Sequence, residues 1–193
     1  MLSSITPLGE RSRRQHFPVT AAFLLAGAAA AGALTGLALV EIGGRLPLDQ
    51  EERLLILAVA AAVGLVCDLF LPGGVPTHLR QVDERWLHRY RGWAYGAGYG
   101  AQLGVGFATV ATSSAVYLTL LGAALAPDLA TGAAIGTVFG AVRGGSVFLA
   151  WRVSSPTRLR AFHRRLSMLD RHARVTALAF QAAIVSAAFA LSA

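Results

Sequence analysis

The sequence predicts an all-α fold, a polytopic bundle of about five transmembrane helices. Of its 193 residues, 55% are hydrophobic and 14% are charged, whereas soluble domains carry roughly 25% charged residues. The charges fall in short stretches between long apolar runs, and about 20 apolar residues allow a helix to cross the hydrocarbon core of a bilayer. Arginine is concentrated on every second connection between the runs, as in proteins that cross a membrane several times.

The expected spans are the five apolar runs of the chain. They cover residues 18–42, 54–71, 95–125, 129–151 and 175–191. Residues 1–17 form a charged N-terminal segment, and residues 18–193 are expected to be a single transmembrane domain. In this domain two hairpins, 18–91 and 95–171, precede the fifth span, 175–191.

The distribution of arginine predicts the orientation of the chain. The N-terminal segment and the second and fourth connections are rich in arginine, the first is mixed, and the third has no cation. Because cytoplasmic loops carry the excess of cations, we expect the N-terminus in the cytoplasm and the C-terminus outside. Trp86, Trp93 and Trp151 fall at the predicted cytoplasmic boundary, where amphipathic aromatic rings prefer to lie.

All 17 cationic residues are arginine, as is typical of a GC-rich genome, and we expect a bacterial inner (plasma) membrane protein.

The segment "SRRQHF" before the first run suggests an alternative, because it is similar to a twin-arginine export signal. A cleaved signal has an apolar region of about 7–15 residues. The run at 18–42 is longer, and further spans follow it, so a retained membrane span is favoured.

Two cytoplasmic connections have similar sequences, "PTHLRQVDERWLHRYR" at 76–91 and "PTRLRAFHRRLSMLDR" at 156–171. Apolar residues recur at helical spacing in both, which predicts two amphipathic helices that lie in the membrane interface. The arginines expected to bind anionic lipid headgroups are Arg80, Arg85, Arg89, Arg158, Arg164 and Arg165. The similarity indicates either a parallel duplication of the two hairpins or the shared composition of short cytoplasmic loops.

Small residues predict close helix packing in the third and fourth runs. The fourth run carries a glycine-zipper row on one helical face, formed by Gly132, Gly136, Gly140 and Gly144. Such rows let two backbones approach closely in lipid. The third run has a similar row, Gly96, Gly100 and Gly104, and nearly opposite it a polar row, Gln102, Gly106, Thr109, Ser113 and Tyr117. We therefore expect the third run to be a central helix.

Arg143 lies within the apolar fourth run, roughly 12 Å inside the cytoplasmic boundary when counted from Trp151. A charge at this depth is costly unless it is paired or hydrated. Arg143 is therefore expected to pair with Asp68 and to hydrogen-bond Gln102. Two interpretations remain open. In the structural one, Arg143 clamps two hairpins together or extends to the lipid headgroups. In the functional one, Arg143 attracts an anion to a pathway that is open from the cytoplasm. The candidate transport cluster comprises Asp68, Gln102, Thr109, Ser113, Tyr117 and Arg143.

Other classes of function are disfavoured. The five histidines lie outside the apolar runs, Ser113 and Ser114 have no partner base, and no HExxH or GxSxG motif occurs. We therefore expect no catalytic centre, metal site or cofactor. The net charge of +7 comes without a basic groove interleaved with aromatic residues, so a membrane surface is favoured over nucleic acid. The single cysteine, Cys67, excludes an internal disulfide, and a packing role is favoured for it.

The stretch "GYGAQLGVGFATVATSSAVYLTLLGAAL" resembles the Gly- and Thr-rich pore helices of the LysE/DsbD-type superfamily of bacterial membrane proteins. That superfamily includes small exporters and CcdA-like thiol carriers. The thiol carriers have a Pro-Cys pair in each half, and this chain lacks both pairs, so the resemblance does not imply thiol–disulfide transfer.

Two functions are consistent with these observations. The first is a small secondary transporter or permease that uses the polar cluster on the cytoplasmic side. The alternative is a non-catalytic subunit or scaffold of a larger membrane complex. The expected partners are anionic lipids together with either a second copy of the chain or another membrane subunit.

Overall fold

The computed structural model describes residues 5–70, 86–107 and 113–192, and in these ranges the chain forms helices and no strands. The all-α expectation is thus confirmed for the described residues. In chain order the elements are α1 (Pro7–Ser12), α2 (Phe17–Gly43), α3 (Gln50–Phe70), α4 (Trp86–Arg89), α5 (Gly92–Val105), α6 (Ala115–Ala124), α7 (Leu129–Gly145), the 3-10 helix η1 (Ser146–Ala150) and α8 (Pro156–Ser192).

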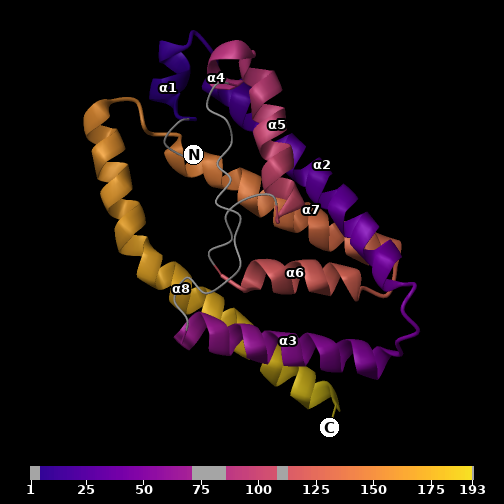
Figure 1. Ribbon diagram of the computed structural model, residues 1–193. Coiled ribbons are helices and arrows are strands. Elements are labelled where there is room, and N and C mark those ends of the chain that lie inside the picture. Colours follow the sequence, from indigo (N-terminus) through magenta and orange to yellow (C-terminus); the bar gives the residue numbers. More distant parts are fainter. Residues whose placement is uncertain (1–4, 71–85, 108–112, 193) are drawn as a thin grey trace.

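The long helix α2 packs between α5 and α7 (Figure 1). An added Cβ at Gly100 of α5 would lie 2.0 Å from the carbonyl oxygen of Leu24, and one at Gly136 of α7 would lie 2.0 Å from that of Gly32. The four glycines of the α7 row are buried against α2. The packing of α2 on α5 and α7 is therefore backbone against backbone at these glycines.

Three helices are long and apolar enough to cross a membrane, and they indicate a membrane protein. They are Phe17–Gly43, Gln50–Phe70 and Leu129–Ala150. These helices match the first, second and fourth expected spans. The expected third span corresponds to the shorter helices α5 and α6, and the expected fifth span corresponds to the C-terminal half of α8.

A second group of helices lies beside the α2–α5–α7 group. The C-terminal half of α8 crosses α3, and α6 lies between α3 and α7 (Figure 1). The helix α8 is continuous from Pro156 to Ser192. The segment 156–171 is therefore helical as expected, but it continues directly into the segment expected as the fifth span. Most of the other expected interfacial helix, 76–91, lies outside the described residues.

Asp128 caps the N-terminus of α7. Its carboxylate accepts hydrogen bonds from the backbone N–H of Thr131 at 2.8 Å and from the Thr131 hydroxyl at 3.0 Å. These bonds, the backbone one first, hold the pKa of Asp128 below its usual range. The cap therefore stabilises α7 at neutral pH, above the pKa of the unfolded chain, and this stabilisation is lost as the pH falls through the lowered value.

The cap predicts a pH-dependent difference between two variants. Asp128→Ala is expected to melt below the wild-type protein at neutral pH, and this gap should close in acid. Asp128→Asn retains a good N-cap that does not titrate. Its melting temperature should therefore change less between neutral and acidic pH than that of the wild-type protein. Thermal unfolding of the three proteins in detergent measures this, and a gap for Asp128→Ala that is constant with pH would contradict it.

Candidate functional site

The expected third span is interrupted, so the prediction of one continuous helix over 95–125 is wrong. The helix α5 ends at Val105, and Gly106 has a φ of +83°, which does not continue a right-handed helix. The next helix, α6, begins at Ala115. An added Cβ at Gly104 would lie 2.2 Å from the carbonyl oxygen of Ala28, near the middle of α2. The interruption therefore lies about halfway along the longest apolar helix of the α2–α5–α7 group.

Arg143 of α7 binds the α5 side of this break. Its guanidinium donates to the carbonyl oxygen of Gly106 at 3.2 Å and lies 5.3 Å from the centre of the Phe139 ring. The last carbonyl groups of a helix lack partners within it and carry a partial negative charge. The half-buried arginine compensates this charge, and the face of the aromatic ring is a further favourable neighbour for a cation.

Asp68 of α3 binds the α6 side of the break. Its Oδ2 accepts hydrogen bonds from the hydroxyl of Ser113 at 2.7 Å and from that of Ser114 at 3.0 Å. The backbone N–H of Ser114, the N-cap residue of α6, lies 3.1 Å from both carboxylate oxygens. Because the N-terminus of a helix carries a partial positive charge, it is a favourable place for a carboxylate.

The expected ion pair between Arg143 and Asp68 is therefore wrong. Each side chain compensates one end of the interrupted helix, so the two charges need no direct contact. The ion pairs within the described ranges are Arg13–Glu10 and Arg45–Glu41. The expectation failed because it assumed a continuous third span. Such a span has no helix ends next to Arg143 and Asp68 that could compensate the two charges.

The other residues of the expected cluster are only partly brought together. Ser113 meets Asp68, whereas Gln102 is half-buried and hydrogen-bonds neither Asp68 nor Arg143 in the described part of the chain. Tyr117 is 36% exposed on α6. Thr109 lies outside the described residues, as do Arg80 and Arg85 of the expected headgroup site. The side chains of the remaining headgroup candidates are exposed: Arg89, Arg158, Arg164 and Arg165.

Two residues of α8 complete the Asp68 cluster and were not expected from the sequence. Gln181 is fully buried and donates its Nε2 to Asp68 Oδ2 at 2.9 Å. Arg174 donates to the backbone carbonyl of Asp68 at 2.8 Å. A polar amide within the apolar run 175–191 is the signal that identifies Gln181, because such residues usually face other polar groups.

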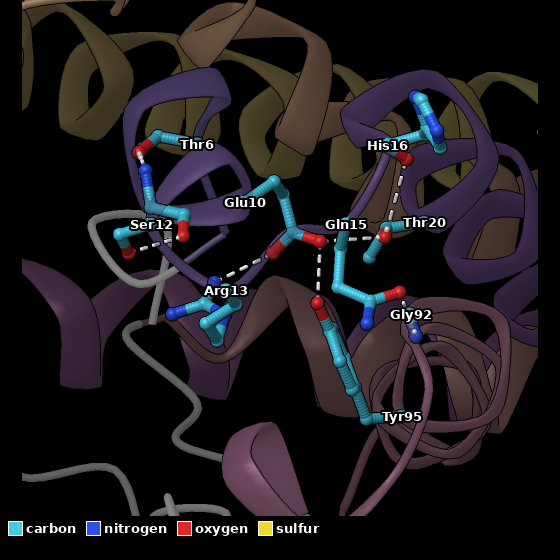
Figure 2. Close-up of polar contacts among 10 residues, drawn as sticks. Thr6, Glu10, Ser12, Arg13, Gln15, His16, Thr20, Gly92 and Tyr95 are labelled. Atoms are coloured by element: carbon cyan, nitrogen blue, oxygen red, sulfur yellow. Dashed lines mark hydrogen bonds and ion pairs between the residues drawn. The ribbon is translucent and has the colours of Figure 1, made fainter.

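The N-terminal segment forms a second polar cluster, shown in Figure 2, at the other end of α5. The carboxylate of Glu10 is fully buried; it accepts a hydrogen bond from the Thr20 hydroxyl at 2.8 Å and a short one from the Tyr95 hydroxyl. Arg13 pairs with the same carboxylate at 2.5 Å. This ion pair and hydrogen bond outweigh the effect of burial and raise the pKa of Arg13. The cluster thus fastens α1 to α2 and α5.

Comparison with protein-family models, with curated protein sequences and with solved structures found no match for this chain. The candidate site rests on its geometry. Among the described residues, no group of three or more His, Cys, Asp or Glu side chains is arranged to hold a metal ion. What the structure provides is an interrupted helix whose two ends each carry a charged side chain from another helix.

Proposed function

We propose that the protein is a small integral membrane permease for anions, with its transport site at the break between α5 and α6. The observation that carries the proposal is the bond between Arg143 and the carbonyl of Gly106, where α5 stops. Non-helical backbone at membrane depth is tolerated where it is buried in protein or lines a water-filled cavity. Secondary transporters build their substrate sites from discontinuous helices of this kind.

The charges at the break suit an anion that arrives beside Arg143. The guanidinium offers N–H donors in a planar fork that matches carboxylate and phosphate oxygens. Asp68 is held on the opposite side of the break by α6 and α8, and so does not neutralise Arg143 through an ion pair. The cation therefore lies at the α5 end of the break and the carboxylate at the α6 end.

The orientation proposed from the arginine distribution places the end with α1 in the cytoplasm. Aromatic residues gather at that end, with Phe17 beside Trp151 and Phe23 beside Trp93. Aromatic rings of this kind are common at the membrane–water interface. In this orientation the exposed Arg158 and Arg164 of α8 meet anionic headgroups of the cytoplasmic leaflet.

The permease is tested with anion currents across reconstituted liposomes on solid-supported membranes, with chloride, inorganic phosphate and acetate as probes. Wild-type protein is expected to carry at least one of them. Arg143→Gln should lower that rate about tenfold or more, because a hydrogen bond to a charged group contributes roughly 1.5–3 kcal/mol. Arg143→Lys, which keeps the charge but not the planar fork, should fall between the two.

Arg45→Gln is the matched control, because the Arg45 side chain is 75% exposed at the other end of α2. It should leave the anion current unchanged. Each variant is first checked for a monodisperse elution profile. A wild-type rate in folded Arg143→Gln, or no current with any of the three anions, contradicts the proposed site.

A non-catalytic membrane subunit is the second candidate, and the exposure of α8 favours it. This helix packs mainly on α3, and apolar residues along it such as Met168, Val175 and Phe180 are more than half exposed. Co-purification with a stoichiometric membrane partner supports this function. A homogeneous homo-oligomer that carries anions supports the permease.

A further inference from the structure

A buried amide on α8 faces the carboxylate of Asp68. Gln181 is 0% exposed, and its Nε2 donates to Asp68 Oδ2 at 2.9 Å and to the Ser114 hydroxyl at 2.8 Å. The other end of the amide, Oε1, is buried and has no hydrogen-bond partner among the described residues. Buried polar atoms are nearly always paired. The cluster therefore contains an acceptor that it does not use while Nε2 faces the carboxylate.

The groups that meet the Asp68 carboxylate are neutral, although Asp68 lies on a helix that is apolar enough to span a membrane. They are two serine hydroxyls, one backbone N–H and the Gln181 amide. The charged group that faces Asp68 from α8 is Arg174, which donates to its backbone carbonyl. Cys67 precedes Asp68 on α3, and Tyr117 lies one turn beyond Ser113 on α6. Asp68 is half-buried and lies two residues before the end of α3, so a proton from water can reach its carboxylate and neutralise it.

We propose that Asp68 is a reversible proton-binding site and that the Gln181 amide turns over when the proton binds. As the site of the coupling ion, it rests on the proposed permease function. The proton comes from water, adds to Oδ2 and returns to water, and no other bond is made or broken. Half a turn of the amide places Oε1 where Nε2 now lies, within hydrogen-bond distance of Asp68 Oδ2 and the Ser114 hydroxyl.

The two states exchange one arrangement of hydrogen bonds for another. With the carboxylate ionised, Nε2 must face it, because two acceptors would repel each other. With the carboxyl protonated, Asp68 and Ser114 both donate to Oε1, and the outer end of the amide has no partner in either state. The orientation of the amide is therefore set by the charge of Asp68. The hydroxyl oxygens of Ser113 and Ser114 lie 2.7 and 3.0 Å from Asp68 Oδ2, which are hydrogen-bond distances. A proton added to Oδ2 fits within the same arrangement, so these oxygens need not move apart.

The site is tested by pH-difference infrared spectroscopy of the full-length protein in liposomes. The wild-type spectrum is expected to show a protonated-carboxyl band at low pH that is missing in Asp68→Asn. Asp128→Asn, which removes an exposed carboxyl, should leave that band in place. A spectrum in which Asp68→Asn removes no carboxyl band would overturn the proposal.

Gln181→Met gives a second readout in case Asp68→Asn does not fold. The variant removes a charge-assisted hydrogen bond from the ionised form and a weaker neutral one from the protonated form, so Asp68 should bind the proton up to about tenfold more tightly and titrate up to about one pH unit higher. An amide that packed beside the carboxylate without a hydrogen bond to it would change stability but not this midpoint. An unchanged midpoint in folded Gln181→Met overturns the proposed role of the amide.

These readouts need no transported ion, so the two proposals fail separately. A band assigned to Asp68 in a protein that carries none of the probe anions refutes the permease and retains the proton site. Anion currents in a protein whose Asp68 stays ionised across the pH range refute the proton site and retain the permease.

Discussion

Gly136→Ala is expected to destabilise the folded protein by about 3 kcal/mol, because overpacking a close helix contact costs roughly this amount. The added Cβ would lie 2.0 Å from the carbonyl oxygen of Gly32 and 3.0 Å from the backbone nitrogen of Gly36. Backbone atoms cannot rotate away as a flexible side chain does, so α7 must separate from α2. Alanine is favoured over glycine in a helix by about 1 kcal/mol, which is too little to offset the clash. The free energy of unfolding in mixed micelles, followed by tryptophan fluorescence, measures the loss.

Gly145→Ala is the matched control on the same helix. A Cβ at this position meets no heavy atom within 4 Å. Here the helix preference of alanine acts alone, so the free energy of unfolding should stay constant or rise by at most about 1 kcal/mol. Equal losses at the two positions would show that α7 and α2 are not in close contact.

The packing face of α7 was predictable from the sequence because it depends on helical periodicity alone. Glycines at every fourth position share one face wherever the helix is straight, and Gly132 to Gly144 do so in the structure. Which helix they meet was not predictable. The partner α2 has its own small residues at Ala28, Gly32 and Gly36, and many apolar runs of this chain contain such residues.

The interruption after Val105 was not predicted, and this changed the account of the site. Hydropathy averages over a whole run, and residues 95–125 remain apolar across the break. The run does contain a local signal, since Gly106 and the serines at 113 and 114 favour turns and helix caps over helix interiors. The expectation treated these residues as one polar face of a continuous helix, and so it placed Asp68 and Arg143 in one cluster. In the structure the same residues lie at helix ends. Asp68 binds the N-terminus of α6, and Arg143 binds the C-terminus of α5.

The role of the N-terminal segment also could not be predicted from composition. Its charges predict a cytoplasmic segment and give no sign that Ile5, Thr6 and Glu10 are buried against the bundle. A buried carboxylate is acceptable there because Thr20 and Tyr95, distant in the sequence, supply donors to it. Such a pairing depends on the tertiary arrangement and has no periodic signal.

Glu10→Ala is expected to cost about 3 kcal/mol of unfolding free energy, since removing one partner of a buried ion pair leaves the other uncompensated. Glu10 is 0% exposed and the Arg13 side chain 15% exposed, so water does not replace the lost carboxylate. The hydroxyls of Thr20 and Tyr95 also lose their acceptor. Glu10→Gln keeps an acceptor for these hydroxyls and should cost less than alanine. The same micelle unfolding experiment measures the three proteins.

Glu41→Ala provides the comparison that separates burial from ion pairing. Glu41 and Arg45, four residues apart at the end of α2, also form an ion pair, but their side chains are 60% and 75% exposed. An exposed pair contributes at most about 1 kcal/mol, so Glu41→Ala should be nearly neutral. A loss at Glu10 no larger than that at Glu41 would mean that α1 does not hold the ends of α2 and α5 together. A large loss confined to Glu10→Ala would instead show that residues 5–16 are part of the folded bundle, as the buried carboxylate and its donors from α2 and α5 require.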